Sequence, residues 1–350
     1  MSEKIQVAVL GATGVVGQRF VRRLAEHPWF QIAHLAASGR SAGKRYSEAC
    51  EWRLDGEPYA GLGHCVLEDA DPALAIAPVV FSALDTEVAR ELEPAYARAG
   101  ALVFSNAAAF RMEEDVPLLV PEVNPEHLAL LAGQRARRGW SGGILTNPNC
   151  TTTVLVLALA PLHAAFGVEA VLMTSMQAAS GAGYPGVSSL DLMGNVIPFI
   201  KGEESKVEIE TAKLLGRFRD GRVEDALLAV SALCHRVPVL DGHTEAVSVR
   251  LKSNPSPEQV REVLDAWRPE PQRLGLPSAP PVPIRLHEAE NRPQVRRDVE
   301  QDAGMSIHVG RIRRCPVLGV KFSLLGHNTE RGAAGGSVLN AELALSQGWV

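Results

Sequence analysis

The stretch IQVAVLGATGVVGQRFVRRLAEHP, residues 5–28, decides the fold of the first half of the chain. It begins with a short β-branched run, turns on glycines, and then spaces Val16, Phe20 and Leu24 on one face of a helix. The glycines form G-x-x-G-x-x-G, a variant of the dinucleotide fingerprint, in which backbone and helix N-terminus approach a pyrophosphate. A plain tight turn between a strand and a helix would carry the same pattern. The dinucleotide interpretation predicts cofactor contacts from Gly11, Ala12, Thr13, Gly14, Val15, Val16 and Gly17.

The segment that follows the next expected strand, QIAHLAAS at 31–38, bears on the choice of cofactor. An NAD-preferring site often has an acidic residue here to bind the ribose hydroxyls. This chain instead has Ser38, Arg40 and Ser41. Hydroxyls and a guanidinium suit a 2′-phosphate, which favours NADP over NAD, although a polar surface loop would look the same.

Further apolar runs at 78–84, 101–107 and 118–123 alternate with helical or turn-rich stretches, as a doubly wound parallel sheet requires. We therefore expect a Rossmann-type domain over residues 1–148, within an α/β protein. Ser82, in the first of these runs, is a further predicted cofactor contact.

The second half of the chain predicts a separate α+β domain over residues 149–328. A helix from 151 to 167 precedes a strand at 168–180. Strand-like runs at 227–233, 243–252, 305–312 and 317–325 favour a largely antiparallel sheet. A capped helix is expected at 255–267 and a Pro-rich extended connector at 274–284. The last segment, 329–350, looks helical after its glycines, and we expect it to return to the first domain.

Composition narrows the classes of partner. The chain has 350 residues, 46% of them hydrophobic, and a net charge of −5 without long like-sign runs, which does not suggest nucleic-acid binding. Five widely spaced cysteines without a C-x-x-C pair argue against disulfides and a zinc site, so we expect no metal and a cytoplasmic setting. No signal peptide is apparent. The most apolar region, 153–176, is interrupted by Pro161, His163 and Glu169, which disfavours a membrane span.

Cys150 occurs where the turn-forming Asn-Pro-Asn of GILTNPNCTTTVLVLALA (143–160) ends and an apolar helical run begins. A free cysteine in such a place is commonly a small buried hydrophobe. A thiol at a helix N-terminus also feels the positive end of the peptide dipoles, which favours a nucleophilic thiolate. These residues alone leave both interpretations open.

Other candidates are ambiguous on their own. Glu203 and Lys206 are three residues apart and usually would form a solvated ion pair. His235, Arg236 and His243 surround a Pro-containing turn, and a lone histidine is more often structural than catalytic.

Taken together, the motifs resemble one family, aspartate-semialdehyde dehydrogenase in its archaeal and fungal-like branch. They occur in family order over nearly the whole chain: GATGVVGQRF, SGRSAGK, SNAAAFRMEEDVPLLVPEVN, TNPNCTTT, QAASGAGYPG, GEESKVEIETAKLLG, RVPVLDGHTEAV and HNTERGAAGGSVLNAE. The resemblance implies reversible, NADPH-dependent reductive dephosphorylation of L-aspartyl 4-phosphate to L-aspartate 4-semialdehyde, a step toward lysine, threonine and methionine. It also implies a homodimer or homotetramer built through the second domain, with small molecules as the other partners.

The resemblance implies a role for each matching residue. Cys150 corresponds to the nucleophile that forms a thioester, and His243 corresponds to the general acid/base. Arg236 corresponds to the clamp for the substrate α-carboxylate and Glu203 to the partner of its α-ammonium group. The remaining implied contacts are Lys206 and Arg111 with phosphate, Asn149 and Gln177 with the acyl group, and Ser180, Gly181 and Asn328 with the cofactor.

Two positions depart from the family pattern. His235 stands where asparagine is expected, so two histidines neighbour Arg236, and we choose His243 from its DGHTE context. Glu330 is the second departure, and it makes the match of this segment to the family's nicotinamide site less specific. His64, Cys50 and Cys65 are interpreted as structural or incidental.

Four other functions are alternatives to this one. N-acetyl-glutamyl-phosphate reductase is expected to have N-P-G-C where this chain has N-P-N-C, and a short-chain dehydrogenase needs a Tyr-x-x-x-Lys that the chain lacks. A malonyl-CoA or succinyl-CoA reductase of the same family would differ mainly in the leaving group. An NADP-binding module without catalysis is the non-enzyme alternative.

Overall fold

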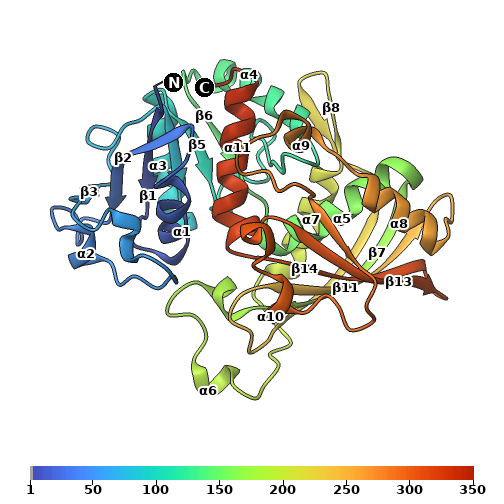
Figure 1. Cartoon of the computed structure of the whole chain (residues 1–350). Coiled ribbons are helices and arrows are strands. Elements are labelled where there is room, and N and C mark those ends of the chain that lie inside the picture. Colours follow the sequence, from blue (N-terminus) through green and yellow to red (C-terminus); the bar gives the residue numbers. More distant parts are fainter. Residues whose placement is uncertain (1–2) are drawn as a thin grey trace.

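The computed structural model describes residues 3–350, and it contains two six-stranded sheets (Figure 1). The first sheet has the order β3-β2-β1-β4-β5-β6, and all its pairings are parallel. Its strands are β1 Ile5–Leu10, β2 Phe30–Ala37, β3 Glu68–Asp69, β4 Val79–Ser82, β5 Leu102–Ser105 and β6 Gly143–Thr146. This is the strand order of a doubly wound dinucleotide-binding sheet, as the opening stretch predicts.

The strand expected at 118–123 does not form. Only Leu118 bridges to the sheet, at Thr146, and the sixth strand is β6 instead. The chain turns here because the amides of Val123 and Asn124 both donate to the carbonyl of Val120. An apolar run can therefore be a buried turn as well as a strand.

Helices cover both faces of the first sheet. On one face Phe20 of α1 (Val15–Leu24) and Leu339 of α11 (Gly335–Ser346) pack against Val7 and Val9. On the other face Tyr96 of α3 (Thr86–Arg98) packs with Leu10. The C-terminal helix thus joins the core of the first sheet and lies between the two sheets in Figure 1. Shorter elements are α2 Tyr46–Ala49, α4 Leu130–Arg138, and the 3-10 turns η1 Pro58–Gly61 and η2 Pro125–Ala129.

The second sheet has the order β10-β7-β11-β14-β13-β12 and is mixed. Its three central pairings are antiparallel, whereas the two outer pairings, β10 with β7 and β12 with β13, are parallel. The strands are β7 Val168–Gln177, β10 Ala229–Arg236, β11 His243–Leu251, β12 Ile284–His287, β13 Ile307–Cys315 and β14 Gly319–Gly326. The sequence located the four long strands after β7 but missed β12, which follows the proline-rich connector.

Helices α5 (Cys150–Phe166), α7 (Glu203–Leu214) and α8 (Pro257–Ala266) pack on one face of the second sheet and form its core. Helix α5 is apolar all round and almost wholly buried, as a central core helix must be. The remaining elements are α6 Ser189–Leu192, α9 Glu270–Leu274, α10 Val295–Asp298, the hairpin β8 Arg217–Arg219 with β9 Arg222–Glu224, the 3-10 turns η3 Ala179–Ala182 and η4 Gln301–Gly304, and the short π-helix η5 Glu330–Ala334.

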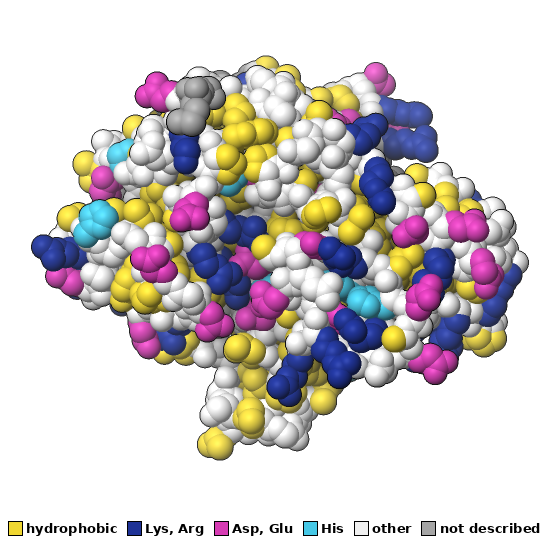
Figure 2. Space-filling model, in the orientation of Figure 1, with side chains coloured by type: hydrophobic (Ala, Val, Ile, Leu, Met, Phe, Trp, Pro, Cys, Tyr) yellow, Lys and Arg dark blue, Asp and Glu magenta, His cyan; other side chains and the backbone are white. Residues whose placement is uncertain are grey.

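A segment around α6 projects from the body (Figure 1) and carries hydrophobic side chains at its surface (Figure 2). Leu190, Met193, Val196 and Phe199 are exposed there. On the face in Figure 2, acidic and basic side chains are otherwise interspersed. In residues 3–350, no helix has the length and apolar character needed to cross a membrane.

A buried ion pair ties η5 to the first half of the chain. Both guanidinium Nη atoms of Arg331 donate to the carboxylate of Glu122, at 2.9 and 2.5 Å. Both side chains are excluded from solvent. Removing one partner of such a pair leaves an uncompensated buried charge.

We therefore expect Glu122→Gln to lower the free energy of unfolding by about 3 kcal/mol, measured by chemical denaturation. Glu114→Gln is the matched control, because Glu114 pairs with Arg137 at 3.8 Å on the exposed surface. That control should cost less than about 1 kcal/mol. Equal losses in the two variants would contradict the importance of the buried pair.

Candidate active site

Cys150 is the first residue of α5, and the residue before it caps the helix. The Oδ1 atom of Asn149 accepts hydrogen bonds from the amides of Thr151 and Thr152, at 2.9 and 3.1 Å. An asparagine at this position satisfies amides that the helix leaves unpaired. The Asn-Pro-Asn turn thereby fixes the thiol at the positive end of the helix dipole, as the nucleophile interpretation requires.

The thiol faces a histidine from the second sheet. Cys150 Sγ lies 3.2 Å from His243 Nε2, and His243 is the first residue of β11. The backbone amide of Ala178 donates to His243 Nδ1 at 3.2 Å. Because Nδ1 accepts this bond, the neutral ring carries its hydrogen on Nε2, where it points toward sulfur.

Burial dominates the electrostatics of this pair. Burial, reinforced by Glu203, raises the pKa of Cys150 to about 12, while Arg111 and Arg236 act in the opposite direction. Burial, with Arg236 and His327, lowers the pKa of His243 to about 3. The pair is therefore a neutral thiol beside a neutral imidazole, and the helix terminus does not by itself produce the expected thiolate.

Two glycines allow the surrounding chain to approach the pair. A Cβ at Gly181 would lie 2.7 Å from an Nη atom of Arg236 and 3.1 Å from His243 Cε1. A Cβ at Gly332 would lie 2.6 Å from the Cβ of Cys150. Any larger residue at either position would displace the thiol, the imidazole or the guanidinium.

Charged side chains predicted to bind substrate gather beside the dyad. Arg236, at the end of β10, donates to the carbonyl of Ala178 at 2.6 Å, and its strand neighbour in register is Gln177. Glu203 accepts a bond from Asn149 Nδ2 at 2.7 Å and pairs with Lys206 at 3.4 Å. The ends of three strands and two helices thus bring an acceptor carboxylate and cations to one place.

Glu210 is a site residue that the sequence reasoning missed. Its buried carboxylate pairs with Arg111 at 3.1 Å and accepts the backbone amide of Asn149 at 2.6 Å. Burial raises the pKa of Glu210, and Arg111 opposes that shift. The signal was present in the sequence, because Glu203, Lys206 and Glu210 have the spacing i, i+3, i+7 of one helix face.

The structure separates the two neighbouring histidines. His235 precedes Arg236 in β10, and successive side chains in a strand point to opposite faces. Arg236 faces the buried side with His243, whereas His235 lies on the face of the exposed Leu233. This geometry supports His243 as the histidine of the site.

Asn328 links the segments next to the dyad. Its Oδ1 accepts the amide of Gly242 at 2.8 Å, and its Nδ2 donates to the Ser180 hydroxyl at 2.8 Å. Glu330, which departs from the family pattern, points away from this contact and binds arginines of α1. It therefore acts between the two halves of the chain rather than beside Asn328.

A cleft of about 1020 Å³ opens at the carboxyl ends of β1, β2 and β4. Its lining includes the predicted Gly11, Thr13, Gly14, Val15, Val16, Ser38 and Arg40. The loop fits a dinucleotide, because a Cβ at Gly11 would lie 2.7 Å from the carbonyl oxygen of Ala83 and one at Gly17 would lie 2.1 Å from that of Gly11. Ala12, Gly17, Ser41 and Ser82 do not line the cleft, and Ser180, Gly181 and Asn328 lie nearer to the dyad.

Arg53 and Tyr184 also line the cleft and were not predicted. The Arg53 guanidinium stacks on the Tyr184 ring, 3.5 Å from its centre. The two residues come from opposite sides, since Arg53 belongs to the first half and Tyr184 follows η3. Sequence reasoning had no local signal for this contact.

Among residues 3–350, one group of three side chains has the spacing of metal ligands: His287, Asp298 and His308. The carboxylate of Asp298 already binds Arg292 and the amide of Gln294. His287 and His308 bond to each other at 3.0 Å. These partners give the cluster a structural explanation.

Comparisons with known proteins agree with this architecture. Residues 6–131 match the family model "Semialdehyde dehydrogenase, NAD binding domain", and residues 159–331 match "Semialdehyde dehydrogenase, dimerisation domain". The chain is 53% identical to aspartate-semialdehyde dehydrogenase of Archaeoglobus fulgidus, covering 98% of this chain and 99% of the relative. It is 43% identical to the Saccharomyces cerevisiae enzyme of that name, covering 99% of each.

Solved structures agree as well. The aspartate semialdehyde dehydrogenase of Candida albicans with NADP has a TM-score of 0.91 and 40% identity, covering 99% of this chain and all of that one. Aspartate semialdehyde dehydrogenase II of Vibrio cholerae complexed with ASA has a TM-score of 0.79 and 27% identity, covering 99% of this chain and all of that one.

The placement of the two histidines generates a prediction. His243→Asn should lower kcat/KM by roughly 100-fold or more, because it removes the donor at the thiol. His235→Asn, one strand position from Arg236 but on the other face, should change kcat/KM by less than about threefold. Steady-state kinetics of both variants test this, and the reverse order would exclude His243 as the acid/base.

Proposed function

The chain belongs to the aspartate-semialdehyde dehydrogenase family, and we propose that Cys150 carries the thioester through which it works. Its reaction is the reversible, NADPH-dependent reductive dephosphorylation of L-aspartyl 4-phosphate to L-aspartate 4-semialdehyde, in amino-acid biosynthesis. The observation that carries the assignment of the nucleophile is the 3.2 Å contact between Cys150 Sγ and His243 Nε2 at the start of α5.

Substrate binding follows from the charges around the dyad. The planar guanidinium of Arg236 is anchored to the carbonyl of Ala178 and suits the α-carboxylate. The carboxylate of Glu203 is an acceptor for the α-ammonium group. Arg111 and Lys206 supply positive charge for the acyl phosphate, and Glu210 holds Arg111 in place. The substrate is thereby oriented with its acyl carbon at sulfur.

The chemistry follows from the proton held by His243. Its Nε2–H donates toward sulfur as the Cys150 thiol adds to the acyl carbon. The bond from the acyl carbon to the phosphate oxygen breaks, and the phosphate leaves as HPO4²⁻ with the proton of the thiol. The bound cofactor supplies the hydride that reduces the thioester. As negative charge develops on the acyl oxygen, the same Nε2–H and the amide of Gln177 are donors that can stabilise it. Collapse to the aldehyde then releases the sulfur to accept a proton again.

We expect the protein to reduce NADP with L-aspartate 4-semialdehyde only when inorganic phosphate is present. Cys150→Ser should abolish this turnover while leaving NADP binding within about twofold, because the cysteine is placed for chemistry rather than for cofactor contact. An absorbance assay and a calorimetric NADP titration measure the two properties. Activity with malonyl-CoA or succinyl-CoA and no phosphate dependence would instead identify an acyl-CoA reductase.

The organisation of the chain is part of the proposal. Residues 1–148 with 329–350 form the NADP-binding domain, and 149–328 form the catalytic and dimerisation domain. The packing of α11 in the first core supports this division. The five cysteines are all unpaired, in keeping with a cytoplasmic protein.

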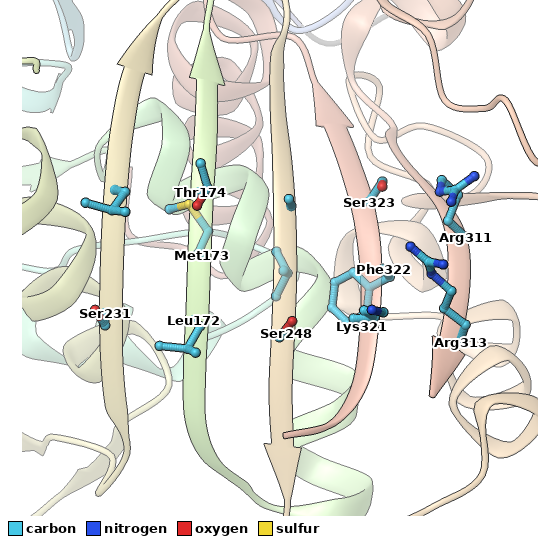
Figure 3. Close-up of a pocket in the computed structure, with 13 residues that line it drawn as sticks. Leu172, Met173, Thr174, Ser231, Ser248, Arg311, Arg313, Lys321, Phe322 and Ser323 are labelled. Atoms are coloured by element: carbon cyan, nitrogen blue, oxygen red, sulfur yellow. The ribbon is translucent and has the colours of Figure 1, made fainter. Parts of the chain in front are cut away.

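We further propose that two copies associate through the open face of the second sheet. Figure 3 looks onto this face, with helices behind the strands, and a hollow lined by residues of β7, β10, β11, β13 and β14 lies on it. Leu172 of β7 and Leu233 of β10 are 48% and 58% exposed there. Arg311, Arg313 and Lys321 lie toward the other edge. The match of this region to a dimerisation domain supports a second copy as its cover.

The double variant Leu172→Asp with Leu233→Asp should therefore be monomeric in sedimentation experiments under conditions where the parent protein is an oligomer, because charges would be buried at the contact. Leu274→Asp, at an exposed leucine in α9, is the matched control and should keep the parent mass. A double variant that sediments like the parent protein would place the interface elsewhere.

A further inference from the structure

The structure brings a carboxylate to the place where the adenosine ribose of the cofactor is expected. In a sheet of this strand order the ribose lies at the carboxyl end of β2. Strand β2 ends at Ala37, and its parallel neighbour β3 places Asp69 directly beside Ala37. Asp69 therefore stands next to Ser38, Gly39 and Arg40, although it is about thirty residues away in sequence.

The carboxylate faces this loop and is available to a ligand. A Cβ built on Gly39 would lie 3.8 Å from Asp69 Oδ2, so the carboxylate lies directly beside the backbone of this loop. The other oxygen, Oδ1, accepts the amide of Ala70 at 3.0 Å, which fixes the carboxylate plane. Within residues 3–350, no Lys, Arg or His forms an ion pair with Asp69, and the nearby His34 pairs with Glu68 instead.

Arg40 and Asp69 line the same cleft and have opposite preferences. A guanidinium favours a 2′-phosphate, whereas a carboxylate accepts a hydrogen bond from a 2′-hydroxyl and repels a phosphate. Two more carboxylates, Asp71 and Asp85, line the cleft and add to the negative field. The site therefore combines a carboxylate from β3, a group of the kind that binds the ribose in NAD sites, with a guanidinium of the kind that binds the 2′-phosphate in NADP sites.

We propose that Asp69 is a specificity-determining residue that opposes the preference for NADP over NAD set by Arg40. Arg40 and Ser38 favour the 2′-phosphate of NADP. Asp69 weakens that preference and accepts the 2′-hydroxyl of NAD. This inference rests on the proposed cofactor site, and it makes the preference for NADP a balance between two side chains rather than a strict selection.

Asp69→Asn tests the balance, because it removes the charge and keeps the shape. NADP should bind about five- to tenfold more tightly, the effect of removing one like charge a few ångströms from a phosphate at a solvated site. NAD should bind about threefold more weakly, because an amide is a weaker acceptor than a carboxylate. The measurement is the Kd of each nucleotide by isothermal titration calorimetry with the ligand-free full-length protein, and it requires no turnover.

Asp71→Asn is the matched control, since Asp71 lines the same cleft two residues further along. It should leave the ratio of the two Kd values within about twofold of the parent, as expected for a more distant charge in water. Arg40→Gln should weaken NADP and leave NAD unchanged.

An unchanged ratio in Asp69→Asn, or an equal shift in Asp71→Asn, would overturn the role of Asp69, because the effect would then be absent or would belong to the general field. A parent protein that binds neither nucleotide would instead overturn the proposed cofactor site. The two failures are therefore distinguishable.

Discussion

The carboxylate of Glu330 in η5 fixes helix α1 of the first half of the chain to the second half. It is buried and bonds to Arg19 at 2.7 Å, to Arg22 at 2.6 Å and to Arg23, all on α1. Burial alone would raise its pKa, but Arg23 and Arg19 outweigh burial and lower the pKa to about 2. The group therefore stays charged near neutrality, and its contribution to stability would be lost progressively as the pH falls from about 4.5 to about 2. Arg19 also pairs with Asp241 at 3.2 Å, two residues before His243. The helix that begins at the glycine loop is thus fixed relative to the segment that leads to His243.

This constraint matters because the dyad is neutral at rest. A buried thiol and a buried imidazole do little to ionise each other until a charged substrate and the cofactor bind beside them. Arg111 and Arg236 favour the thiolate, while Glu203 opposes it. Neutralisation of Glu203 by a substrate ammonium group would therefore move the thiol toward its reactive form. The reactivity of Cys150 becomes a property of the assembled complex, which protects the free thiol from unproductive chemistry.

The sequence predicted those features that depend on local pattern. The glycine turn, the capped Cys150 helix and the Glu203–Lys206 face are each contained within about ten residues, and the family motifs supplied their roles. Glu210 could have been found by extending the same helical face one more turn. His235 could have been assigned to the outer face once Arg236 was placed inward, because neighbours in a strand alternate. Asp69, Arg53 and Tyr184 could not be found in this way, since only the pairing of a two-residue strand and the packing of a distant loop bring them to the cleft. The run at 118–123 was misassigned because apolarity reports burial and not conformation.

The mixed sheet has the proposed contact between copies on one face and the candidate site on the other. Gln177 and Arg236 lie on the buried face at the ends of β7 and β10, while Leu172 and Leu233 lie on the open face of the same two strands. The strands are paired in continuous register, from Ala229 with Ala170 to Arg236 with Gln177. β10 is an edge strand, and β7 pairs with one side of it. On its other side the Glu204 and Glu208 carboxylates of α7 accept the amides of Cys234 and Ala232, and Arg236 bridges to Ile197. A second copy packed on Leu172 and Leu233 would restrain this edge and, through it, the orientation of the Arg236 guanidinium. Association on one face of the sheet would then stabilise substrate-binding geometry on the other, without any residue of the second copy entering the site.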